Sequence, residues 1–111
     1  MSIKYIDVFP LLANTLPEFE ASAEEWAEPT PYVFLSEMRQ YVCQRASLGG
    51  TIEIDQFSTL LEKLALEGDS DVQDLVLDSL EGLLECESKD IIARRFGSKT
   101  KQLWASVSQQ A

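Results

Sequence analysis

The chain has 111 residues, 45% of them apolar and 25% charged, and its formal net charge at pH 7 is −10. This composition excludes a disordered chain and fits one folded domain spanning residues 1–111. The negative charge argues against nucleic acid and anionic membrane as direct ligands, because both require a positively charged surface. It favours a cationic protein partner, or serves solubility alone.

The first half of the chain carries signals for three helices. Residues 3–14 place apolar side chains at helical spacing, with Pro10 limiting the regularity of that segment. Residues 15–26 begin with a cap-and-proline signal and predict a second, short helix. The same signal at residues 30–31 predicts a third helix to about residue 46, before the glycine-containing breaker at residues 47–50.

Two further helices are expected in the middle of the chain. One opens at Thr51 or Asp55, and Gly68 is expected to close it as the C′ residue. The other is capped by Asp69 or Ser70 and is expected to run to about residue 87.

The last quarter predicts a short helix capped by Ser88 and a final amphipathic segment capped by Ser98. No stretch shows the convincing alternation of apolar and polar residues that a strand requires. The predicted fold is therefore all-α, a compact bundle of about six or seven short antiparallel helices.

Four carboxylates follow one side of the helix that begins near residue 70, namely Asp74, Asp78, Glu81 and Glu85. At about 100° per residue they span only about 60° of arc. Residues 64–88 contain no Lys or Arg. Like charges at i,i+4 destabilise a helix, so unpaired acids on one side suggest a surface kept for a basic partner. We predict that these four residues and Asp71 bind that partner.

A second base-free block covers residues 5–38 and contains seven acidic residues. Glu24 and Glu28 from this block belong to the predicted binding set. Tyr32 joins them, because a tyrosine can bury its ring while its hydroxyl stays in water, and such residues often anchor interfaces. The alternative interpretation is that both blocks are solvated faces without a partner. The presence of two acidic blocks without Lys or Arg in one chain favours binding of a basic partner over solvation alone.

The two cysteines, Cys43 and Cys86, show no CxxC spacing, which argues against a disulfide framework and against a zinc site. Reduced, at least partly buried thiols are expected. The sequence has neither a signal peptide pattern nor a run of 18 apolar residues, so a cytosolic protein is expected.

Signals for catalysis are missing from the sequence. Histidine is absent, which removes the commonest general base and the commonest transition-metal ligand. There is no GxSxG elbow and no phosphate-binding loop with its lysine. The aspartates at residues 69–74 lack the glycine and the glutamate of a calcium loop. We expect no enzymatic activity, no metal and no cofactor.

Three segments carry a family resemblance: "FPLLANTLPEFEASAEEW" near the start, "GDSDVQDLVLDSLEGLLE" in the acidic helix and "RRFGSKTKQLW" near the end. They resemble a family of small bacterial immunity proteins that accompany polymorphic or contact-dependent growth-inhibition toxins. The resemblance implies an all-helical inhibitor without catalytic activity. It also implies that such an inhibitor binds the C-terminal domain of a cognate toxin, often a nuclease with a basic cleft, and shields its active site.

The leading hypothesis is therefore an immunity protein that acts through its acidic surface. The alternative is a helical adaptor or regulatory subunit that docks a partner helix into an apolar groove. The two differ in their response to salt, because only binding between charged surfaces weakens strongly as ionic strength rises.

Overall fold

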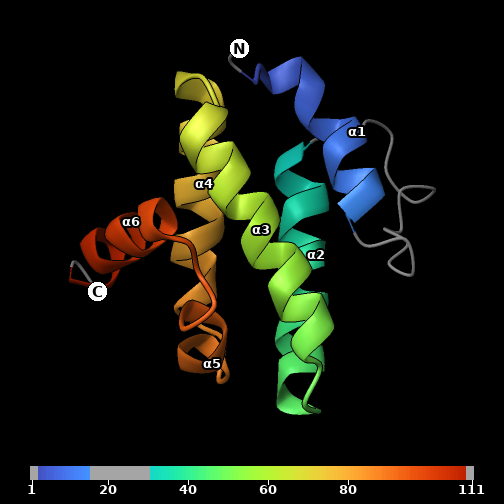
Figure 1. Ribbon diagram of the computed structural model, residues 1–111, viewed down its shortest axis with the longest axis vertical. Coiled ribbons are helices and arrows are strands. Elements are labelled where there is room, and N and C mark those ends of the chain that lie inside the picture. Colours follow the sequence, from blue (N-terminus) through green and yellow to red (C-terminus); the bar gives the residue numbers. More distant parts are fainter. Residues whose placement is uncertain (1–2, 16–30, 110–111) are drawn as a thin grey trace.

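The computed structural model describes residues 3–15 and 31–109. The short helix expected at residues 15–26 lies outside the described residues except for residue 15. Glu24 and Glu28 of the predicted binding set also lie outside them. The described part contains six helices and no strand, which confirms the all-α bundle (Figure 1). The helices are α1 (Tyr5–Thr15), α2 (Pro31–Ser47), α3 (Thr51–Glu67), α4 (Ser70–Leu83), α5 (Lys89–Ala93) and α6 (Ser98–Gln109).

The helix α4 forms for the reasons that the sequence indicates. The carboxylate of Asp69 accepts a hydrogen bond from the backbone N–H of Val72 at 3.1 Å and so caps the first turn. The helix ends at Leu83, about four residues earlier than predicted. Beyond it the N–H of Glu85 bonds the carbonyl of Gly82, three residues back, in a tighter turn that takes the chain out of the α-helix.

The core is one cluster of apolar side chains shared mainly by α2, α3 and α4. Along each of these helices the buried residues recur every three or four positions, so each helix offers one apolar stripe to its neighbours. Fully burying one such side chain contributes about 1.5–3 kcal/mol, so the packing of the three stripes against one another dominates the stability of the fold. Side chains with at most 1% exposure include Leu35, Met38, Val42, Ile54, Phe57, Leu61, Leu64, Val72, Val76 and Leu80.

Two short connections make α2 and α4 run in the same direction, with α3 antiparallel to both (Figure 1). The first connection turns at Gly49, whose φ of +86° favours glycine. The second passes through Gly68, which ends α3 as expected but has an extended backbone in place of the left-handed one common for glycine at this position. Glycine is required there for space, because a Cβ would collide with the carbonyl of Leu64 and the side chain of Val72.

The start of the chain is fixed to this second connection. The N–H of Ile3 bonds the carbonyl of Glu67 at 2.6 Å, and the N–H of Asp69 bonds the carbonyl of Ile3 at 2.9 Å. Together they form an isolated parallel bridge between Ile3 and Gly68. The first turn of α1 is thereby placed beside the start of α4.

Cys43 and Cys86 form a disulfide bond, with an S–S distance of 2.02 Å and a Cα–Cα distance of 6.2 Å. The prediction of reduced thiols was wrong. The cysteines are 43 residues apart, and only the side-by-side packing of α2 and α4 brings them together. None of the described helices is long and apolar enough to cross a membrane.

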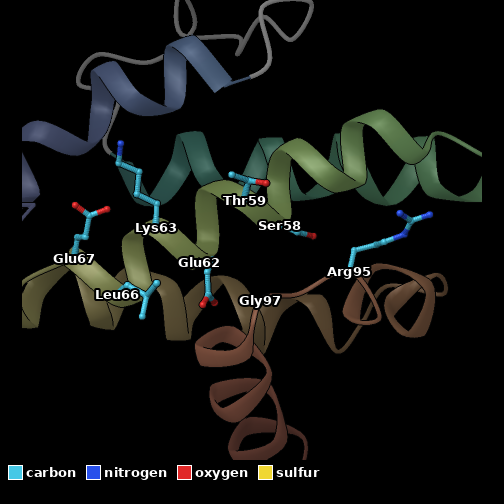
Figure 2. Close-up of a pocket in the computed structure, with 8 residues that line it drawn as sticks. All are labelled: Ser58, Thr59, Glu62, Lys63, Leu66, Glu67, Arg95 and Gly97. Atoms are coloured by element: carbon cyan, nitrogen blue, oxygen red, sulfur yellow. The ribbon is translucent and has the colours of Figure 1, made fainter.

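The helix α6 is capped by a distant side chain and not by Ser98, which is already its first residue. Glu62 of α3 accepts hydrogen bonds from the N–H of Thr100 at 2.9 Å, from its hydroxyl at 2.8 Å and from the N–H of Lys99 at 3.2 Å. Figure 2 shows its carboxylate directed toward Gly97 and α6. The predicted cap at Ser88 is likewise not formed by its side chain.

Candidate protein-binding surface

The predicted acidic residues of α4 are all exposed on one side of the helix. The acidic face, as we call it, consists of Asp71, Asp74, Asp78, Glu81 and Glu85. The first four project from α4 itself, while Glu85 lies in the turn that follows it. Because the opposite stripe of α4 is buried against α2 and α3, the face is held on a rigid element.

Within the described residues no internal base forms an ion pair with the acidic face, although Arg39 lines the same hollow as Glu85. All nine Lys and Arg residues of the chain fall within the described ranges. Within residues 3–15 and 31–109 the ion pair found joins Arg95 to Asp55 at 3.3 Å, and none involves a member of the acidic face. The negative charge of the face is therefore left to solvent, counterions or a partner.

Tyr32 lies beside the first half of the acidic face. Its side chain is 36% exposed, and its ring centroid is 6.2 Å from that of Tyr5, with the planes tilted by 39°. Partial burial raises the pKa of Tyr32, and the charges of Asp74 and Asp78 raise it further. Like any tyrosine hydroxyl at neutral pH, that of Tyr32 is protonated and can donate a hydrogen bond, and the raised pKa extends this to more alkaline pH.

A constant register between α2 and α4 explains this proximity. The offset of 43 residues that separates the two cysteines also separates Arg39 from Gly82, one turn earlier on each helix. The same offset sets Tyr32 level with Leu75, between Asp74 and Asp78. The sequence does not reveal this register, since neither helix alone shows which of its residues faces which residue of the other.

The far end of the acidic face has different surroundings. Glu85 lines a hollow of about 340 Å³ together with Arg39, Gly82 and both cysteines. The half-buried Arg39 lies against Gly82 and donates a hydrogen bond to the hydroxyl of Ser36 at 3.3 Å. The structure thus joins Tyr32 with the first three acids, while Glu85 belongs to the disulfide end. Glu81 lies on α4 between them.

The described residues gather no group of three or more His, Cys, Asp or Glu side chains able to hold a metal ion. The acidic face is a row of separated carboxylates, and what it can do physically is attract and bind positive charge.

A family model matches residues 9–111, which is most of the chain. The chain belongs to this family, described as "Domain of unknown function (DUF7674)". Comparison with curated proteins matched nothing, and comparison with solved structures matched nothing. For this DUF7674 domain the function has to be argued from the surface itself.

Proposed function

We propose that the protein is an immunity protein, which binds and neutralises a toxin domain by covering it with the acidic face. The observation that carries the proposal is the row of five exposed carboxylates, none of which is ion-paired within the described residues. Like charges spaced four apart on a helix destabilise it by about 0.2–0.5 kcal/mol per pair. A binding role gives a reason for keeping them.

The partner that fits this face is a protein with a basic cleft. A nuclease that binds phosphate offers such a cleft, and the resemblance to immunity proteins suggests the same class of partner. Complementary charge accelerates encounter, with association rate constants of up to about 10⁸–10⁹ M⁻¹s⁻¹ at low salt. Rapid capture suits an inhibitor of a lethal enzyme.

The tyrosines add a contact that charge alone does not supply. Tyr32 and Tyr5 offer flat aromatic surface next to Asp74 and Asp78, with a hydroxyl held in its neutral form. Tyrosine is enriched among the residues that dominate interface energies. In this proposal they form the anchor around which the carboxylates pair with Lys and Arg of the toxin.

The rest of the proposal follows from the same role. The protein acts in the cytoplasm, where the toxin is active, and catalyses nothing itself. It requires no cofactor and contacts neither nucleic acid nor membrane.

Growth protection tests the proposal. A bacterial host produces a candidate toxin, the C-terminal domain of whichever large secreted protein is found encoded beside this gene, together with the wild type or a variant. The Asp74→Lys/Asp78→Lys variant alters the acidic face. Its charge-matched control is Asp55→Lys/Asp90→Lys, which makes the same charge change on exposed residues of α3 and α5. This control also breaks the exposed Asp55–Arg95 ion pair, a loss of about 1 kcal/mol or less.

We expect the wild type and the control to restore growth and the acidic-face variant to fail. Protection by all three proteins would remove the acidic face from the interface. Failure of the wild type against this toxin domain would reject toxin neutralisation as the function.

A further inference from the structure

The disulfide opens onto the surface of the molecule. Both sulfur-bearing residues line the hollow of about 340 Å³ between α2 and the end of α4. Cys43 is half-buried and Cys86 is 9% exposed, so Cys43 is the more accessible of the two. The hollow therefore offers a small thiol a route toward the disulfide that does not require unfolding of the core.

Two opposite charges line the same hollow. Arg39 stands one helical turn before Cys43, and its guanidinium lies over Gly82, one turn before Cys86. A cation near a disulfide attracts an incoming thiolate and stabilises the thiolate that departs. Glu85, exposed on the opposite wall, has the reverse effect on both. The hollow thus contains one group that accelerates thiol attack and one that slows it.

We propose that the Cys43–Cys86 pair is a site of reversible thiol–disulfide exchange, reduced by a dithiol in the folded protein. One thiolate of the dithiol attacks Sγ of Cys43, forming a mixed disulfide as the Cys43–Cys86 bond breaks and Cys86 departs as a thiolate. The second thiol of the dithiol then attacks the dithiol sulfur that is bonded to Cys43. This closes the ring of the oxidised dithiol and releases Cys43 as a thiolate. The protein gains two electrons and two protons, and the dithiol is oxidised to its disulfide.

The proposal requires the fold to survive this reduction. Cys86 belongs to the core and Cys43 packs against it, but the largest fully buried side chains are other residues, whose contacts do not depend on the S–S bond. The helices α2 and α4 also contact each other, and Tyr32 at the start of α2 lies near Asp74 and Asp78. Reduction would release the turn after α4 that contains Glu85, while Tyr32, Asp74 and Asp78 stay together. The proposed thiol–disulfide exchange is independent of the toxin-binding proposal, because reduction of Cys43–Cys86 by a small dithiol requires no partner protein.

The test is the rate of reduction of the oxidised protein by dithiothreitol without denaturant, followed by counting free thiols in quenched samples. The variants are Arg39→Gln, Arg39→Lys and Glu85→Gln. We expect a rate that is proportional to the dithiothreitol concentration. Arg39→Gln should slow it by about threefold to tenfold, Arg39→Lys should restore most of it, and Glu85→Gln should increase it.

A disulfide that serves only as a structural staple gives a different result. Its reduction occurs only in globally unfolded molecules, so its rate rises with added urea as steeply as the unfolded fraction of the oxidised protein does. A rate with that urea dependence, or rates that are unchanged by both Arg39→Gln and Glu85→Gln, would overturn the proposal. So would two free thiols in protein purified under air.

Discussion

Gly82 of α4 leaves the space that the guanidinium group of Arg39 on α2 occupies. In sequence terms Gly82 is a weak position, since glycine inside a helix costs about 1 kcal/mol relative to alanine. In the structure a Cβ at this position would collide with Arg39. The glycine lets the long cationic side chain of Arg39 lie across the interface between the parallel helices α2 and α4.

A double-mutant cycle measures this relationship. Gly82→Ala in an Arg39→Ala background should raise the free energy of unfolding by about 1 kcal/mol, the gain in helix propensity. In the wild-type background the gain should be smaller by about 0.5 kcal/mol or more, because the guanidinium has to move. Urea unfolding of the four proteins gives the coupling energy. Equal gains in both backgrounds would show that the two residues do not interact.

The cap that Glu62 provides to α6 predicts a dependence of stability on pH. Partial burial favours the protonated carboxyl, but the hydrogen bonds from Thr100 and Lys99 and the charge of Lys99 outweigh it, so the pKa of Glu62 lies below its ordinary value of 4.5. A lowered pKa stabilises the folded state above the ordinary value, and this contribution is lost as pH falls through the lowered pKa.

Glu62→Gln should therefore lower the free energy of unfolding by about 1–2 kcal/mol at pH 7. The difference from wild type should shrink as the pH falls below about 4. Glu67→Gln on the same helix is the control, because Figure 2 shows the Glu67 side chain directed away from α6. A Glu62→Gln deficit that is the same at pH 7 and at pH 3 would contradict an ionised cap.

The disulfide predicts a large effect of reduction on stability. In the chain-entropy treatment, a link between residues 43 positions apart contributes about 4 kcal/mol. We expect the reduced wild type to unfold at a clearly lower urea concentration than the oxidised wild type. The Cys43→Ala variant, which cannot form the bond, should resemble the reduced protein. Midpoints that agree for all three would show that the bond does not stabilise the fold.

The pKa of Tyr32 tests whether the acidic face and the tyrosine lie together in solution. Because Asp74 and Asp78 raise it, an Asp74→Asn/Asp78→Asn variant should titrate at lower pH. The measurement is an NMR titration of ring-labelled tyrosine. Asp55→Asn/Asp90→Asn should leave the pKa unchanged, and an equal shift in both variants would indicate a general effect of net charge.

The sequence predicted what depends on local pattern and missed what depends on packing between helices. Apolar spacing placed α3 and the start of α4 correctly, and Asp69 caps α4 as one of the two expected residues, while the end of α4 at Leu83 was predicted about four residues too late. The cap of α6 comes from Glu62, which is 38 residues away from Thr100, and no local signal marks it.

The candidate site divides in the same way. The exposure of the acids on α4 followed from their helical phase, since an amphipathic helix must bury its other side. The placement of Tyr32 beside Asp74, and of Cys43 against Cys86, required the register between α2 and α4. That register depends on α3 and its two connections, which bring α4 back alongside α2. No residue pattern in α2 or α4 alone encodes it.

The measurement that tests the account most directly is the association rate constant with the toxin domain, taken by stopped flow as ionic strength rises from about 0.01 M to about 1 M. Over this range the Debye length falls from about 30 Å to about 3 Å, which screens the attraction between complementary faces. We predict a steep decline for the wild type. Asp74→Lys/Asp78→Lys should start lower and decline much less than Asp55→Lys/Asp90→Lys, which has the same net charge. Identical rates and identical slopes for these two variants would contradict binding through the acidic face.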